Sequence, residues 1–185
     1  WSQQSAVSLA IGYEIGVTPL QMALAYGALA NGGVLMQPRL VSEVSDAGGA
    51  VLERQRPKVV RRVIPEAVAR ELGAVLEGAV EDGTATAARL ETFRVAGKTG
   101  TSRVNVGGGY VAGRYYASFV SFFPVDDPQL VVFVKLDSPE GAYYGGTTAA
   151  PVTRAMVEGA LAAWGTPLDR TALLRSFRRP ESVPP

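Results

Sequence analysis

The residues with the clearest chemical potential lie in the segment "RVAGKTGTSRV", residues 94 to 104. Lys98, Thr99, Gly100 and Thr101 are consecutive there, so a cation and two hydroxyls flank a residue that has no side chain. Two kinds of chemistry use such a run. It can end a glycine-rich loop that binds phosphate, or it can form one wall of a site in which a serine transfers an acyl group.

The spacing argues against the phosphate-binding loop. That loop requires another glycine five residues before Gly97, where this sequence has Thr92. It also requires a helix directly after the threonine, because the first amides of that helix bind the phosphate, and "GTSRVNVGGGY" does not begin one. We therefore predict that the run lies on a β-strand.

Each residue of the run then has a role in acyl transfer. Lys98 supplies a fixed positive charge that steadies the hydroxyl network of the nucleophile and attracts an anionic substrate. The hydroxyls of Thr99 and Thr101 can donate hydrogen bonds to a substrate carboxylate. Gly100 lets an extended substrate lie against the strand as an added strand, and the Thr101 amide can stabilise an oxyanion.

The alternation of side chains along a strand constrains this arrangement. Lys98 and Gly100 point to one face of the sheet, and Thr99 and Thr101 point to the other. A site that uses all four must straddle the open edge of a sheet, so we expect an edge strand. Taken alone, the run is better explained as a half-buried edge strand that happens to contain a lysine and two glycines.

The composition excludes several other classes of function. With 18 Lys and Arg against 17 Asp and Glu, the net charge of +1 gives no general attraction to nucleic acid or anionic membranes. The sequence has no Cys and no His, which removes thiolate chemistry and the commonest base and metal ligand. The acidic pairs Glu81-Asp82 and Asp126-Asp127 and the basic pairs Arg61-Arg62 and Arg178-Arg179 are typical of solvated surface. We expect no metal, no cofactor and no nucleic-acid partner.

The length of 185 residues and an apolar content of 47% predict one domain, or part of one. In the helix after Pro65, the apolar face is predicted to carry Val68, Leu72, Val75, Leu76 and Ala79. In the last helix, the face on the sheet is predicted to carry Val152, Ala155, Gly159 and Ala163. The predicted helices are 19–31, 65–83 and 149–164. The predicted strands are 93–102, 115–123 and 130–137. A hairpin is predicted around residues 46–49. We expect the first helix to be buried and the last two strands to be interior.

Four segments together resemble a known family. They are "IGYEIGVTPLQMALAYGALANGGV", "VAGKTGTS", "RYYASFVSFFPVDDPQLVVFVKLDSP" and "AYYGGTTAAPVTRAM". In this order and spacing the chain resembles the C-terminal part of the transpeptidase domain of class B penicillin-binding proteins, of the septal, cell-division type. The resemblance implies a mixed α+β fold for residues 1–170, in which helices flank an antiparallel sheet as in penicillin-binding proteins and serine β-lactamases. A tail or linker is expected over 171–185.

The resemblance also implies an activity. In this family a serine attacks the penultimate D-alanine carbonyl of a peptidoglycan stem peptide, and β-lactams trap the acyl-enzyme. Lys98, Thr99, Gly100 and Thr101 match the third family motif, and Tyr143 and Tyr144 match positions that form an apolar wall near the bound acyl group. A plug over the core explains this tyrosine pair almost as well. The implied location is the outer face of the bacterial cytoplasmic membrane, reached through an N-terminal anchor.

This sequence departs from the family pattern at the nucleophile. Residues three before each of its lysines are Gln or Val, so it contains no Ser-x-x-Lys motif, and it contains no Ser-x-Asn motif. It starts at Trp1, and we expect a fragment or processed piece that is completed by an upstream part of the same domain. A non-catalytic scaffold or β-lactam-sensing module that binds division proteins remains an alternative, as does a β-lactam hydrolase or D,D-carboxypeptidase.

Overall fold

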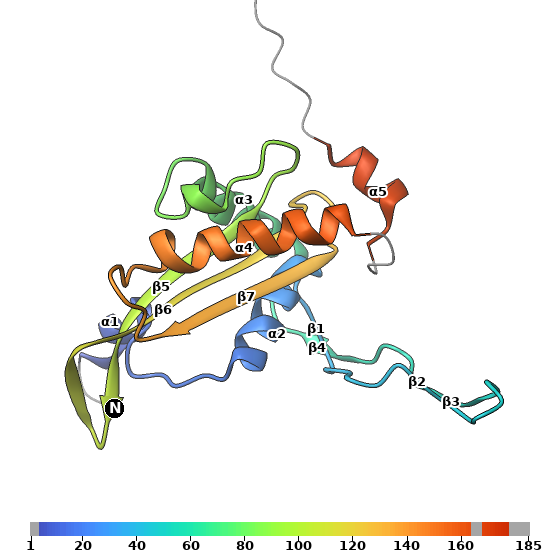
Figure 1. The fold of residues 1–185 in the computed structure, drawn as a ribbon, viewed down its shortest axis with the longest axis horizontal. Coiled ribbons are helices and arrows are strands. Elements are labelled where there is room, and N and C mark those ends of the chain that lie inside the picture. The colour runs from blue at the N-terminus through green and yellow to red at the C-terminus, as the bar shows by residue number, and fades with distance from the viewer. Residues whose placement is uncertain (1–3, 164–167, 178–185) are drawn as a thin grey trace, which may run out of the picture.

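The computed structural model describes residues 4–163 and 168–177, and these form an α+β fold in which helices lie against a twisted antiparallel sheet (Figure 1). This confirms the predicted fold class. The helices are α1 (Ser5–Ala10), α2 (Pro19–Ala30), α3 (Glu66–Glu81), the short 3₁₀ helix η1 (Thr86–Ala88), α4 (Gly145–Ala162) and α5 (Arg170–Arg175). The strands are β1 (Val34–Met36), β2 (Glu43–Ser45), β3 (Val51–Arg54), β4 (Val59–Arg62), β5 (Ala96–Val106), β6 (Gly109–Phe123) and β7 (Leu130–Asp137).

The main sheet has the strand order β5-β6-β7, and both pairings are antiparallel. The second half of β6 is covered on both faces: Phe119 and Phe123 are fully buried on one side, and Val120 and Phe122 are 5% and 3% exposed on the other. The predicted interior position of this strand is therefore confirmed. Within the described residues β7 pairs with β6 alone and is mostly half-buried, so the expectation that β7 is interior is not met there.

Helix α4 crosses one face of this sheet (Figure 1). The prediction for its contact face was wrong, since Val152 is 41% exposed and Gly159 is exposed. The residues that α4 buries are Gly145, Ala149, Ala150, Thr153 and Val157, and none of them is in the predicted set. The helix begins four residues earlier than predicted, at Gly145, and its buried residues Ala149, Ala150 and Val157 belong to the same core cluster as Phe119 and Phe123.

Helix α3 packs on the opposite face through small residues. Ala69 and Gly73 are buried, and the position of a Cβ on Gly73 would lie 3.6 Å from the Phe122 ring. The predicted apolar face was wrong for three of its five residues, because Val68 and Leu72 are each 39% exposed and Val75 is 70% exposed, whereas Leu76 and Ala79 are half-buried. The helix uses residues without bulk where its backbone must approach a phenylalanine ring, which hydrophobic periodicity does not detect.

Helix α2 begins and ends nearly where the sequence predicts. The Thr18 hydroxyl accepts a hydrogen bond from the Gln21 amide, and the Gln21 side chain accepts one from the Thr18 amide, which makes a capping box before Pro19. The expectation of a buried helix was wrong, however, because only Ala28 is buried within it. Its small residues line the α2 surface without being enclosed by the described part of the chain.

The predicted hairpin is also present. Asp46 shapes the turn between β2 and β3, because its Oδ1 accepts hydrogen bonds of 2.9 Å from the amides of Gly48 and Ala50. The β2–β3 ribbon extends away from the body of the molecule (Figure 1) and contacts no other described helix or strand.

The predicted tail at 171–185 needs correction in its first part. Residues 171–175 belong to helix α5, and two of them, Ala172 and Leu173, are each only 4% exposed. Apolar side chains in "RTALLR" pack one face of this short helix on the core. The charged residues beside them make this apolar face hard to recognise from the sequence. Residues 178–185 lie outside the described residues.

Candidate active site

The run Lys98 to Thr101 lies in the first half of β5, which pairs with β6 on one side and has its other edge open within the described residues. Lys98 is opposite Val120, on the face that packs on α3. Thr99 and Thr101 are opposite Phe119 and Ala117, on the face that packs on α4. The predicted alternation of side chains and the predicted edge strand are both found. The site residues therefore surround a free strand edge.

The Lys98 side chain is exposed and returns across this edge toward the other face. Its Nζ lies 3.0 Å from the Thr99 carbonyl oxygen and 3.5 Å from the Thr99 hydroxyl. The ammonium and the first hydroxyl of the run therefore reach the same edge, although their side chains leave the strand on opposite faces. This placement keeps a positive charge beside hydroxyl groups that can bind an anion.

A third hydroxyl joins this group from outside the strand. The Oγ1 atoms of Thr84 and Thr99 are 2.8 Å apart, and Thr84 belongs to the loop between α3 and η1. Sequence reasoning missed Thr84, because it lies fourteen residues before Lys98 in a loop with no motif of its own. Its position follows only from the packing of that loop on β5 and α4.

The hydroxyl of Thr101 meets the beginning of helix α4. The Gly145 amide, at the first position of the helix, donates a hydrogen bond of 3.2 Å to Thr101 Oγ1. The first amides of a helix have no partner within the helix, so this bond satisfies one of them from a neighbouring strand. The Thr101 proton stays available for donation to a substrate anion, near the positive end of the helix dipole.

Three glycines make this close approach possible. A Cβ on Gly145 would lie 2.1 Å from the Ser118 carbonyl oxygen and 2.6 Å from the Gly100 carbonyl oxygen. A Cβ on Gly146 would lie 2.0 Å from the Thr84 carbonyl oxygen, and one on Gly100 would lie 2.6 Å from Ser118 Oγ. Only residues without side chains let the helix start against the ladder between β5 and β6.

The two tyrosines before α4 form part of an aromatic stack on the same face. The rings of Tyr143 and Tyr115 are stacked with centroids 4.2 Å apart, and the Tyr143 and Tyr144 rings are 4.5 Å apart. The Tyr143 hydroxyl donates a hydrogen bond to that of Tyr144, and this bond is the main reason why the pKa of Tyr143 is raised above its usual value. The nearby charge of Arg103 opposes the shift. Tyr144 is 59% exposed, so this stack presents a free ring rather than a plug sealed into the core.

The site residues form an open surface. Two surface hollows lie elsewhere in the described structure. One, of about 330 Å³, lies between α2 and the start of β7, and the other, of about 320 Å³, lies at the base of the β2–β3 ribbon. Neither includes Lys98, Thr99 or Thr101. No group of three or more acidic side chains among the described residues is placed to hold a metal ion. The chemistry that the wall can support is the binding of an extended, anionic peptide end along β5.

Thr101→Val is expected to lower the free energy of unfolding by about 1 kcal/mol, because it leaves the Gly145 amide without its acceptor while the volume of the side chain is kept. Thr101→Ser keeps the hydroxyl and is expected to stay within about 0.5 kcal/mol of the parent chain. Urea unfolding followed by circular dichroism measures both. If Thr101→Val and Thr101→Ser had equal free energies of unfolding, the hydrogen bond from the Gly145 amide would not contribute to stability.

Comparison with known proteins now decides the family. The model of the penicillin binding protein transpeptidase domain matches residues 1–158. The chain belongs to this transpeptidase family. It is also 36% identical to stage V sporulation protein D of Bacillus subtilis and 35% identical to the probable peptidoglycan D,D-transpeptidase PbpC of Pseudomonas aeruginosa. Each alignment covers 91% of this chain, but only 26% and 28% of the respective relative.

A solved transpeptidase structure supports the same assignment. The acyl-enzyme complex of penicillin-binding protein A from M. tuberculosis with ceftriaxone matches 80% of this chain with a TM-score of 0.73 and 28% identity. The match covers 33% of that protein, so this chain corresponds to a part of a penicillin-binding transpeptidase. No helix in the described ranges has the length and apolar character needed to cross a membrane.

Proposed function

We propose that this chain is the C-terminal portion of the transpeptidase domain of a peptidoglycan D,D-transpeptidase, which cross-links stem peptides in septal cell-wall synthesis and is a target of β-lactams. The observation that carries the proposal is the convergence of the Lys98 ammonium and the Thr99 hydroxyl at the open edge of β5. Such an edge can receive the D-Ala-D-Ala end of a stem peptide as an added strand.

The residues of the wall have distinct roles in this proposal. Lys98 attracts the terminal carboxylate and stabilises the hydroxyl network around the nucleophile. The hydroxyls of Thr99 and Thr101 donate to that carboxylate, and Thr84 orients the Thr99 hydroxyl through their 2.8 Å contact. Gly100 leaves room for the backbone of the peptide.

The Thr101 amide donates to the oxyanion that forms when a serine attacks the penultimate D-alanine carbonyl. Terminal D-alanine then leaves, and the acyl group passes from the serine to the amine of a second strand. Tyr143 and Tyr144 form the apolar wall beside the acyl group. The exposed ring of Tyr144, stacked on Tyr143, suits this role.

The nucleophile must come from another segment, because the sequence has no Ser-x-x-Lys motif. We propose that this segment is an upstream part of the same domain, that the present chain completes the domain, and that an N-terminal anchor holds the protein at the outer face of the cytoplasmic membrane. We also propose that the complete protein binds other division proteins.

The absence of the Ser-x-x-Lys motif also favours a second candidate, a non-catalytic binding or β-lactam-sensing module of the same fold. The sequence encoded before Trp1 separates the two. A Ser-x-x-Lys motif followed by Ser-x-Asn supports the enzyme, and a coding sequence without them supports the module.

Labelling with a fluorescent penicillin tests the proposal directly. The 185-residue chain alone is expected to form no covalent adduct. The complete domain, meaning this chain joined to the upstream segment encoded in its gene, is expected to be labelled on a serine of that segment. Mass spectrometry of the digested adduct identifies the site. An adduct on a serine of this chain, or an unlabelled complete domain that is correctly folded, would contradict the proposal.

A further inference from the structure

The described residues beyond the part matched by the family model return to the body of the molecule. The match ends at residue 158, yet residues 168–177 contact helix α4, the turn between β6 and β7, and the segment that leads into β5. We infer that this C-terminal segment is a clamp that fixes the base of β5, the strand that carries Lys98 to Thr101.

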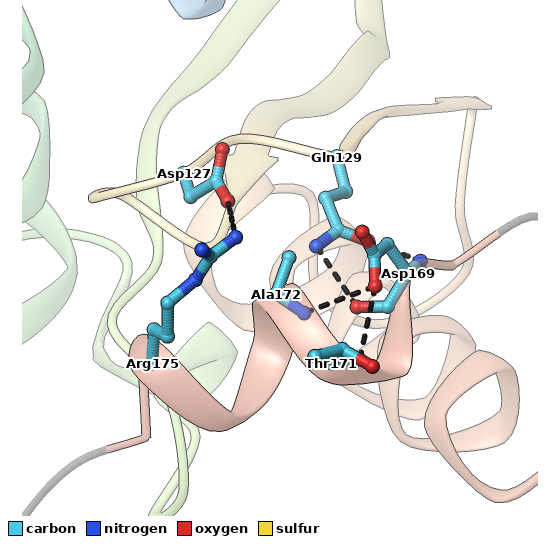
Figure 2. A network of polar contacts seen from close by, with 6 residues as sticks. All are labelled: Asp127, Gln129, Asp169, Thr171, Ala172 and Arg175. Carbon is cyan, nitrogen blue, oxygen red and sulfur yellow. Dashed lines mark hydrogen bonds and ion pairs between the residues drawn. The ribbon is translucent and has the colours of Figure 1, made fainter.

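The first attachment of the clamp is to the turn before β7. The Asp169 amide donates a 2.8 Å hydrogen bond to Gln129 Oε1, and Gln129 Nε2 donates a 3.3 Å bond to the Asp169 carbonyl oxygen. Asp169 also caps α5, because its Oδ1 accepts from the amides of Thr171 and Ala172 (Figure 2). A 3.9 Å ion pair between Arg175 and Asp127 lies at the other end of α5 (Figure 2).

The second attachment is to the end of helix α4. The Arg170 guanidinium donates to the carbonyl oxygens of Ala160, Leu161 and Ala163, which belong to the last turn of α4 or follow it. The final carbonyl groups of a helix have no partner within the helix, and a cation there also complements the helix dipole. The Arg170 side chain therefore caps the C-terminal end of α4, the helix that covers the sheet.

The third attachment reaches β5 through aromatic rings. Phe177 forms a β-bridge with Phe93, and the two rings meet edge to face with centroids 5.5 Å apart. Phe93 makes a second edge-to-face contact, also at 5.5 Å, with the fully buried Phe123 of β6. Phe93 comes three residues before Ala96, where β5 begins, so Phe177 holds the chain at the point of entry into the strand.

Burial makes the clamp part of the core. Leu168 is 7% exposed and Leu173 is 4% exposed, and both belong to the same hydrophobic cluster as Phe93 and Phe123. Leu174, the next residue, is 75% exposed and supplies a matched control. The clamp is therefore expected to stabilise the base of β5 through its buried face and through Phe177.

Hydrogen exchange of the complete domain, meaning this chain joined to the upstream segment encoded in its gene, tests the clamp. In Phe177→Ala, exchange of the amides at 91–97 is expected to become about tenfold faster, while exchange in β7 at 130–137 changes by less than about twofold, because local opening exposes only the released segment. Phe177→Tyr keeps the ring and is expected to match the parent. Leu173→Ala is expected to lower the thermal midpoint by roughly 10 °C, and Leu174→Ala by about 1 °C or less.

The pattern across the variants decides the inference. Faster exchange confined to 91–97 in Phe177→Ala, with Phe177→Tyr and Leu174→Ala like the parent, supports the clamp. Equal acceleration in 91–97 and 130–137, or a Phe177→Ala variant that exchanges like Leu174→Ala, overturns it. Should Leu173→Ala fail to fold, the Phe177 pair still decides.

Discussion

Lys98→Ala is expected to reduce the second-order rate constant for acylation of the complete domain by a β-lactam about a thousandfold. The substitution removes a positive charge that stands at the free edge of β5, 3.5 Å from the Thr99 hydroxyl. Both the attraction of the carboxylate and the support of the nucleophile's hydroxyl network are lost. Stopped-flow measurements with a fluorescent penicillin give the rate constant.

Two controls separate this effect from a loss of folding. Lys98 is exposed, so Lys98→Ala is expected to change the free energy of unfolding by less than about 0.5 kcal/mol. Lys58→Ala removes an exposed lysine from the segment between β3 and β4, and is expected to leave the acylation rate unchanged. Acylation of the Lys98→Ala domain at the parental rate would show that the ammonium has no part in the reaction.

The elements that the sequence predicts well are those with strong local signals. The turn "PVDDPQ" separates two apolar runs and correctly predicts the antiparallel pairing of β6 and β7, and Leu130–Asp137 is found with the predicted limits. Thr18 and Pro19 mark the start of α2 for the same reason, because a capping box and a proline act over a few residues. These signals need no knowledge of distant contacts.

The errors arise where tertiary packing reverses a local preference. Gly145 and Gly146 disfavour a helix, so the sequence places the start of α4 later, at residue 149, but α4 begins on these glycines because only they fit against β5 and β6. In the same way, β6 extends back to Gly109 through a region whose glycines weaken strand propensity. The ladder with β5 compensates for that weakness.

The same distinction between local signals and distant contacts applies to the residues of the candidate site. Lys98, Thr99 and Thr101 could be found from one strand, since their alternation follows from the geometry of a single segment. Thr84 and the Gly145 amide could not, because they reach the strand from a loop and a helix distant in sequence. The sequence therefore predicts the wall of the site, and the structure adds the residues that orient it.

Gly145→Ala is expected to lower the free energy of unfolding by about 3 kcal/mol, a large effect for one methyl group. The added Cβ would lie 2.1 Å from the Ser118 carbonyl oxygen, which belongs to the central strand and cannot withdraw without breaking the β5–β6 ladder. Helix α4 must therefore move away from the sheet, and the bond from the Gly145 amide to Thr101 is lost as well. Urea unfolding of the complete domain measures the change.

The matched control lies in the same helix. A Cβ on Gly159 meets no atom within 4 Å, and this exposed position in the last turn of α4 favours alanine, so Gly159→Ala is expected to stabilise the protein by roughly 0.5 kcal/mol. The same substitution thus has opposite signs at the two positions, because contact with the sheet decides one and helix propensity decides the other. If Gly145→Ala were as stable as the parent, helix α4 would not start against the ladder between β5 and β6, and the Thr101 hydroxyl would lack the partner that holds it at the site.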